Sequence, residues 1–260
     1  MSASNDNNVG FIEDAGVAWI TLNRPDKLNS LTSDMIQQLQ KHFSQISTSS
    51  TVRAVVVVGA GRAFCAGQDL GDIEGADLGD VLERDFNPLI RAIKGLNMPV
   101  IACVNGVAAG AGANIALACD LVLAAKSAKF IQSFAHLGLV PDAGGSWSLP
   151  RLIGLPRAIG LAMTAEPLSA EQAEQWGLIW RCIDDDALMI ETTALATKLA
   201  SQATTGLAFT KQLLNNSGTK TLDEQLDLER DFQQAACKTQ DYSEGVNAFL
   251  NKRNPTFTGK

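Results

Sequence analysis

Short runs of apolar residues alternate along the chain with longer segments in which apolar residues recur every three or four positions. Three of these runs are continuous, which is typical of strands buried on both faces, and the first of them is rich in β-branched residues. They are Ala54–Val58, Pro99–Val104 and Leu121–Ala124. A fourth β-rich run, Val17–Leu22, ends at the turn signal Asn23-Arg24-Pro25-Asp26.

Several of the intervening segments have the spacing of helices with one apolar face. From Ser33 onward the apolar positions of the first segment are Met35, Ile36, Leu39, Phe43 and Ile46. Thr32 or Ser33 is available there as the N-cap residue. The segments Phe86–Leu96 and Gly110–Ala118 are predicted as two further helices. Strands that alternate with helices in this way indicate an α/β fold with layered sheets.

The pattern changes near Asp186, after which the chain is polar and helical. The helices expected there are Ala187–Ala203, Gly206–Asn216, Leu222–Thr239 and Tyr242–Leu250. These segments hold too few apolar residues to build a core of their own, so we expect them to cover the α/β core or a neighbouring subunit. The predicted organisation is a core of residues 1–190 followed by a helical cover or oligomerisation region of residues 191–260.

Composition narrows the classes of protein that fit this pattern. The 260 residues are 46% hydrophobic with a net charge of −7, which suits a globular domain and disfavours nucleic acid as a partner. Met1–Val9 has no apolar run of the signal-peptide type, and the apolar stretch Gly106–Ala125 is interrupted by Asn114 and Asp120. We therefore expect a cytoplasmic protein with no membrane partner.

Histidine and cysteine usage limits the chemistry that the chain can perform. The sequence has only 2 His, and its 5 Cys include no C-x-x-C pair, so neither a metal site nor a disulfide framework is indicated. General acid–base chemistry is therefore expected to fall on a carboxylate.

Two glycine-bearing loops follow predicted buried strands. The first is Phe64–Leu70 and the second is Asn105–Gly112, which leads into a predicted helix. Small residues let a ligand approach the backbone, and the free N–H groups of a helix N-terminus favour negative charge. The two loops are suited to present two amides to one oxygen as an oxyanion hole. Tight packing of strand against helix explains the same residues equally well.

A third glycine-bounded segment, Gly138–Gly145, carries a single carboxylate, Asp142, among apolar residues. Desolvation there would raise the pKa of Asp142, which suits a group that exchanges protons with carbon. The alternative is that Asp142 is the N-cap of a following helix.

Taken in order, these elements resemble the crotonase (enoyl-CoA hydratase/isomerase) superfamily over nearly the whole chain. The matching segments are Leu22–Asn29, Ala63–Leu70, Pro99–Ala108, Cys119-Asp120, Pro141–Gly145 and Phe249–Pro255. The resemblance implies a spiral of ββα units with a C-terminal helical region, a homotrimer or a dimer of trimers, and an acyl-CoA thioester as substrate. It implies no cofactor beyond the coenzyme A of that substrate.

The resemblance also assigns roles to residues. It places the two oxyanion-hole amides at Ala66 and Ala111 and the proton-transferring carboxylate at Asp142. It implies that a further group of residues contacts the substrate, namely Lys27, Leu28, Ala66, Gln68, Asp69, Leu70, Gly112, Phe134 and Trp147. The acidic, glycine-rich stretch Gly71–Asp80 is expected to form a mobile loop beside the acyl group.

Departures from the family pattern favour one reaction. The two glutamates that hydratases use correspond here to Asn114 and Phe134, which makes hydration a poor fit. The position of Asp142 matches that of the catalytic aspartate in several isomerases of the superfamily. The stretches Ala108–Asn114 and Phe130–Trp147 resemble the corresponding stretches of isomerases that convert an aromatic ring epoxide, 2-(1,2-epoxy-1,2-dihydrophenyl)acetyl-CoA, to an oxepin-CoA. Isomerisation of 3-enoyl-CoA to 2-enoyl-CoA is implied as well.

Three alternatives remain open from the sequence. The first is another enoyl-CoA isomerase of fatty-acid oxidation. In the second, Asp142 attacks an aryl-CoA ring as a nucleophile, as in a dehalogenase or hydrolase of the superfamily. In the third, the protein binds CoA without catalysis.

Overall fold

The computed structural model describes residues 8–72 and 74–260, so most of the polar start Met1–Val9 lies outside the described residues. Ten strands form two sheets within this part of the chain. The larger sheet has the order β1-β2-β3-β5-β7-β10, and the smaller one has the order β4-β6-β8-β9. Only the β1–β2 and β8–β9 pairs are antiparallel.

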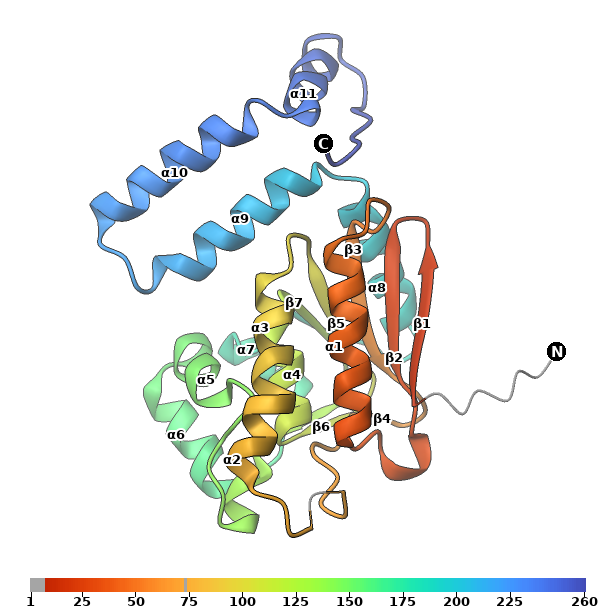
Figure 1. The fold of residues 1–260 in the computed structure, drawn as a ribbon, viewed down its shortest axis with the longest axis vertical. Helices are drawn as coiled ribbons and strands as arrows, with labels where there is room; N and C mark the ends of the chain where they lie inside the picture. Colours follow the sequence, from red (N-terminus) through yellow and green to blue (C-terminus); the bar gives the residue numbers. More distant parts are fainter. Residues whose placement is uncertain (1–7, 73) are drawn as a thin grey trace, which may run out of the picture.

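The strands of the larger sheet confirm the buried runs seen in the sequence. Its strands are β1 (Val9–Asp14), β2 (Val17–Leu22), β3 (Ala54–Gly59), β5 (Val100–Val104), β7 (Leu121–Ala125) and β10 (Arg181–Ile183). All five residues of β5 are buried, as expected for a strand with both faces covered. Helices α1 (Ser33–Ser47) and α3 (Asn87–Gly95) cover one face of this sheet, and α8 (Leu188–Ala200) covers the other (Figure 1).

Three strands of the larger sheet are each followed directly by a short strand of the smaller sheet. The short strands are β4 (Ala63–Cys65), β6 (Val107–Ala109), β8 (Lys129–Ile131) and β9 (Leu168–Ser169), of which the first three follow β3, β5 and β7. The turns are tight: a Cβ on Gly59 would lie 2.2 Å from the carbonyl oxygen of Ala63, and one on Gly106 would lie 2.1 Å from that of Arg62. Only glycine fits these two turns. The ββα repetition is the one that the family resemblance implied.

Helix α1 shows how the sequence pattern determines local structure. Its five predicted apolar positions are all buried, and the Thr32 hydroxyl accepts a hydrogen bond from the amide of Met35 as the N-cap. The acidic stretch Gly71–Asp80, in contrast, becomes helical at Leu78, where α2 (Leu78–Val81) begins with Asp77 as its N-cap. A π-turn over Leu82–Phe86 joins α2 to α3.

Helices that follow β6 complete the α/β core. Helix α4 (Ala111–Ala118) follows β6 and is buried along its whole length. The sequence pattern had not indicated α5 (Gly145–Ile153), α6 (Leu155–Thr164) or α7 (Ala170–Trp176). Helix α5 packs against α4 and α6.

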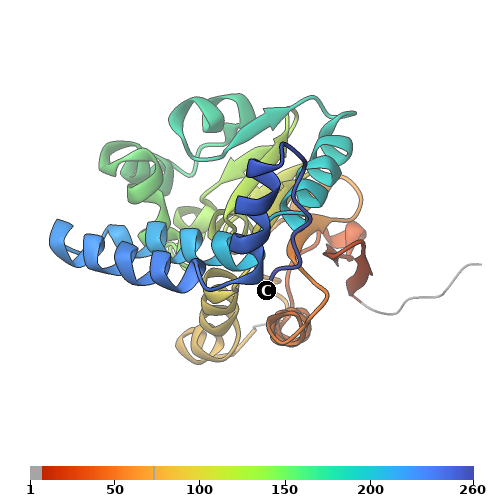
Figure 2. The same cartoon turned by 90° about the horizontal axis from the view of Figure 1, so that it is seen from above.

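The C-terminal helices leave the core as a projecting arm. Helices α9 (Thr204–Ser217) and α10 (Leu222–Ala236) lie side by side and extend away from the sheets, and α11 (Gln240–Leu250) follows beyond them (Figures 1 and 2). The predicted domain boundary at residue 190 falls inside α8, which packs on the larger sheet. The arm itself therefore begins after Ala200.

A buried ion pair anchors this arm to the core. The Lys211 ammonium of α9 contacts Asp120 at 2.9 Å and donates a hydrogen bond to the carbonyl of Ile93 at 3.0 Å. Desolvation raises the pKa of Asp120, an effect that the nearby Lys211 opposes. Breaking such a pair would leave a buried charge without its partner, so the contact fixes where α9 leaves the core.

Candidate active site

Parallel pairing of β4 with β6 brings the two glycine-bearing loops together. Cys65 is paired with Ala108, so the chain segments that follow the two strands leave the sheet at the same edge. Gly67, at φ +98°, lies so close to the second loop that a Cβ on it would be 2.9 Å from the carbonyl oxygen of Ala109 and 3.6 Å from the amide nitrogen of Ala111. The two loops that the sequence singled out are therefore in direct contact.

Ala111 is the first residue of α4, and its amide is one of the donors that a helix leaves unpaired. Among the described residues, no hydrogen bond engages this amide. Gly110 immediately before it adopts φ 51° and ψ −128°, a conformation suited to glycine. The predicted donor at Ala111 is thus free to bind an oxygen atom.

The prediction for Ala66 as the second free donor is wrong in this structure. Its amide donates to the carbonyl of Leu28 at 2.9 Å, a backbone contact that joins the first loop to the turn after β2. An amide engaged in this way does not serve a ligand unless that bond breaks.

Gln68 supplies the second free amide instead. The carbonyl of Gly67 accepts from the amide of Leu31 at 2.8 Å, and the amide of Asp69 donates to the carbonyl of Leu31 at 2.9 Å. Because backbone groups alternate sides along an extended chain, the Gln68 N–H points away from Leu31. This N–H has no hydrogen-bond partner within the described ranges. Sequence reasoning placed Gln68 in the binding loop but assigned the donor two residues too early.

Asp142 lies in the loop between η3 (Ser133–Leu137) and α5. Its backbone carbonyl accepts two hydrogen bonds, from the side-chain amide of Asn114 at 2.9 Å and from the amide of Gly145 at 2.8 Å. Asn114 stands three residues after Ala111 in α4, so this contact brings the Asp142 loop to the helix that carries the free donor.

The side chain of Asp142 is half-buried, and a hydrogen bond from its own backbone amide opposes the effect of that burial on its pKa. Its Oδ1 atom is buried and has no hydrogen-bond partner among the described residues. Desolvation raises the pKa of Asp142 from 3.8 to about 6. The alternative role as a helix N-cap is not seen, because Gly144 is the N-cap of α5 and no side chain caps that helix.

Phe134 and Trp147, predicted as substrate contacts, have different surroundings. Phe134 is buried, and its ring lies 3.8 Å from the position that a Cβ on Gly110 would take, so it borders the start of α4. Trp147 is 43% exposed on α5, where its ring lies 4.2 Å from the guanidinium carbon of Arg151. Phe134 therefore borders the residue just before the free amide of Ala111.

The remaining predicted contacts divide between surface and packing positions. Lys27 is exposed, Leu70 is 51% exposed, and Leu28 is partly buried with φ 50°. Asp69 pairs with Arg24 at 2.9 Å, and the hydrogen bond from Arg24 is the main cause that lowers the pKa of Asp69. A Cβ on Gly112 would lie 2.5 Å from the carbonyl oxygen of Cys65, so Gly112 serves the packing of α4 on β4.

A cavity of about 660 Å³ lies beside the Asp142 loop, between α3, α5 and α9. Gly144 and Trp147 line it from the side of α5, and Ile90 and Lys94 line it from α3. Desolvation lowers the pKa of Lys94, whose ammonium lies 5.9 Å from the centre of the Trp147 ring.

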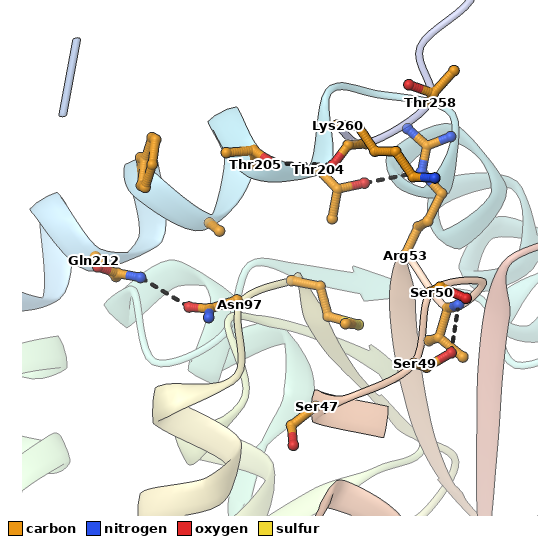
Figure 3. Close-up of a pocket in the computed structure, with 15 residues that line it drawn as sticks. Ser47, Ser49, Ser50, Arg53, Asn97, Thr204, Thr205, Gln212, Thr258 and Lys260 are labelled. Carbon is orange, nitrogen blue, oxygen red and sulfur yellow. Dashed lines mark hydrogen bonds between the residues drawn. The ribbon is translucent and has the colours of Figure 1, made fainter. Parts of the chain in front are cut away.

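Figure 3 shows a second cavity, of about 350 Å³, between the end of α1 and the start of α9. Arg53 lines this cavity. The Arg53 guanidinium donates to the Thr204 hydroxyl at 2.9 Å and to the carbonyls of Phe257 and Gln202. Arg53 thus joins the C-terminal segment to the start of α9. The residues predicted for catalysis do not line this cavity. In the part of the chain that the structure describes, no cluster of three His, Cys, Asp or Glu residues is arranged to hold a metal ion.

Residues 13–260 match the profile of the enoyl-CoA hydratase/isomerase family, and the chain belongs to that family. A 1,2-epoxyphenylacetyl-CoA isomerase of Escherichia coli strain K12 is 52% identical over 251 residues, which cover 94% of this chain and 96% of that protein. A "probable enoyl-CoA hydratase" of Rhodobacter capsulatus is 45% identical over 247 residues, 94% of this chain and 95% of that protein. The crystal structure of an enoyl-CoA hydratase from Bacillus anthracis matches with a TM-score of 0.93 at 32% identity and covers 98% of this chain and 100% of that one.

The comparisons confirm the crotonase fold and make this protein an enzyme of the crotonase family. The named relatives include both an isomerase and hydratases, so membership alone leaves the reaction type open. The choice between reaction types has to come from the site.

Ionisation of the buried Asp142 carboxyl is expected to destabilise the fold. The pKa of Asp142 in the folded protein, about 6, exceeds the ordinary 3.8. The loss of folding stability that ionisation causes is therefore absent below pH 4, grows between pH 4 and 6, and reaches its full size above pH 6. Asp142→Asn should raise the free energy of unfolding by about 1–3 kcal/mol at pH 8 and leave it unchanged at pH 3.5. Urea unfolding at both pH values measures this, with the exposed Asp186→Asn as the matched control. Equal stability of the wild type and Asp142→Asn at pH 8 would contradict the burial of the charge.

Proposed function

We propose that the protein is an acyl-CoA isomerase that converts 2-(1,2-epoxy-1,2-dihydrophenyl)acetyl-CoA to an oxepin-CoA and also shifts the double bond of 3-enoyl-CoA thioesters. The observation that carries this proposal is the Asp142 carboxylate, whose Oδ1 atom is buried and has no hydrogen-bond partner in the described residues. The 52% identity to a 1,2-epoxyphenylacetyl-CoA isomerase supports the choice of substrate.

In the proposed mechanism the thioester carbonyl accepts hydrogen bonds from the amides of Gln68 and Ala111. These donors stabilise the enolate that forms when Asp142 removes a proton from the carbon next to the carbonyl. The same carboxyl then returns the proton at another carbon, so that product and substrate have the same composition. In the epoxide, the carbon–carbon bond shared by the three-membered and six-membered rings also opens, and its electrons form the double bonds of the seven-membered oxepin. A pKa near 6 lets one group act as base and then as acid close to neutral pH.

Asn114 weighs against hydration in this proposal. Its side-chain amide is engaged by the carbonyl of Asp142 and by Gln132, and an amide does not exchange a proton with water as a carboxyl does. Phe134 likewise offers no acid or base. One carboxylate suits a proton shuttle better than the addition of water, which needs a proton donor and a base for water together.

Asp142→Asn should lower the turnover of 3-enoyl-CoA isomerisation by about 10³-fold while CoA binding persists, because the amide removes the base. For the wild type, kcat/KM should rise with pH and level off above about pH 6, since the ionised carboxyl is the base. The measurement follows deuterium at the α and γ carbons of the thioester in heavy water. A trapped aspartyl adduct with an aryl-CoA would favour the nucleophilic alternative, and absence of both isomerised product and exchange would favour a protein that only binds CoA.

The amide of Ala111 can be removed by a proline, which is tolerated at the first position of a helix. Ala111→Pro should reduce kcat by about 10²–10³-fold and leave the helix folded, because one oxyanion donor is lost. Steady-state kinetics and far-UV circular dichroism measure the two effects. Leu155→Pro, at the exposed first position of α6, is the control that should keep normal turnover. If Ala111→Pro is folded and fully active, Ala111 is not an oxyanion donor.

The oligomer belongs to the same proposal: a homotrimer or a dimer of trimers assembled through the projecting arm. Helix α10 has no buried residue, and large apolar side chains are exposed along the arm, namely Leu214, Leu222, Leu226, Val246, Phe249 and Leu250. Large exposed apolar side chains on a projecting element support an interaction surface there. Among the described residues, no helix is long and apolar enough to cross a membrane.

Light scattering coupled to size exclusion should give a mass of three or six times 27.6 kDa. Leu222→Glu together with Leu226→Glu should reduce that mass, because charges would be buried between subunits. The exposed Met163→Glu on α6 serves as the control. A monomeric wild-type protein would contradict the proposed assembly.

A further inference from the structure

Two buried amide side chains form a chain of hydrogen bonds that ends on the backbone of Asp142. Gln132 is 3% exposed and donates from Nε2 to Asn114 Oδ1 at 2.9 Å. Asn114 is 1% exposed and donates from Nδ2 to the carbonyl oxygen of Asp142 at 2.9 Å. The chain links the end of β8, the middle of α4 and the Asp142 loop, which are far apart in sequence.

The direction of these bonds is fixed by the last acceptor. A backbone carbonyl only accepts, so Asn114 has to present its NH₂ group to Asp142 and its oxygen to Gln132. Gln132 in turn has to present its NH₂ group to Asn114. The oxygen Oε1 of Gln132 is left buried and without a partner in the described residues.

An orphaned buried acceptor destabilises the folded state, and an apolar side chain of similar shape would avoid that cost. Stability alone therefore does not account for a glutamine at position 132. What Gln132 provides is the orientation of Asn114, and through Asn114 the position of the Asp142 backbone.

The loop around Asp142 has a conformation that needs such support. Ala143 has φ 45° and Gly144 has φ 78°, so the two residues after Asp142 are both left-handed, and one of them carries a Cβ. Conformations of this kind persist only where the surroundings impose them. The adjoining Gly145 approaches so closely that a Cβ on it would lie 2.3 Å from Asn114 Nδ2.

We propose that Asn114 and Gln132 are positioning residues that hold the Asp142 backbone so that its carboxyl oxygen stays buried, unpartnered and aimed for proton transfer. This inference rests on the proposed function, in which Asp142 moves the proton. Neither amide takes part in the chemistry. Their effect passes through Asp142 alone, with Gln132 acting only through Asn114.

Loss of the support lets the loop relax and lets water reach the Asp142 carboxyl. The solvated carboxylate is a weaker base and lies out of line with the substrate carbon. Positional errors of about 1 Å cost catalysis about 10²-fold. Binding of the thioester, which depends on other loops, changes little.

The test compares Asn114→Ala, Gln132→Met and Gly145→Ala, which disturb the same bonds from three sides. Gly160→Ala is the matched control, because a Cβ there meets no atom within 4 Å. The pKa of Asp142 is measured in each free protein from the carboxyl infrared band that Asp142→Asn removes. The expected result for the three variants is a fall from about 6 toward 3.8 by about one unit, with none for the control.

Kinetics of 3-enoyl-CoA isomerisation supply the second readout. We expect kcat to fall about 10–100-fold with KM within about threefold, and the acid limb of the pH profile to move down with the pKa. Gln132→Met should add nothing in an Asn114→Ala background, as required if Gln132 acts through Asn114.

The inference is overturned if Asn114→Ala and Gln132→Met keep the wild-type pKa of Asp142 and the wild-type kcat, whether or not their melting temperatures fall. Independent, additive effects of the two substitutions would overturn the role of Gln132. If Asp142→Asn itself stays active, the proposed function fails, and the infrared titration of the free protein still decides the positioning role.

Discussion

The architecture depends on backbone approaching backbone at two glycines. At Gly59 and Gly106 the chain turns from the larger sheet into the smaller one, and a Cβ at either position would overlap main-chain atoms. These turns let β4 pair with β6 directly behind β3 and β5. The loops that follow β4 and β6 then touch one another, and everything in the candidate site is arranged around that contact.

Electrostatics divides the site into two complementary parts. The free N–H groups of Gln68 and Ala111 offer partial positive charge where an anionic oxygen would develop, and the helix dipole of α4 adds to it. Asp142 holds the opposite charge in an apolar loop without an ion-pair partner among the described residues. A carboxylate that the fold leaves unpaired is a cost to stability, and such costs are typical of functional sites.

Much of the fold was predictable because its strands and several of its helices carry strong local patterns. Buried runs such as Val100–Val104 and the spacing of Met35, Ile36 and Leu39 determine strand and helix whatever surrounds them. The bounds of helices α5 to α7 were not predicted, since Pro and Gly interrupt α5 and α6, and α7 is a seven-residue helix whose only large apolar residue is Trp176. The sequence pattern predicted the helices of the arm to within a few residues. It did not predict the direction in which the arm projects, because no local feature of the sequence identifies the surface that packs against it.

The sequence by itself determined the α/β class and the family resemblance, and that resemblance singled out Asp142 as the candidate carboxylate in a chain with two histidines. Tertiary structure alone decided which amides are free. Ala66 and Gln68 are two residues apart and look alike as donors, but Leu28 accepts from the first and none of the described residues accepts from the second. It also decided that Asn114 and Gln132 support Asp142. Hydrogen bonds between distant segments depend on how strands pair and turn, and no spacing along the chain encodes them.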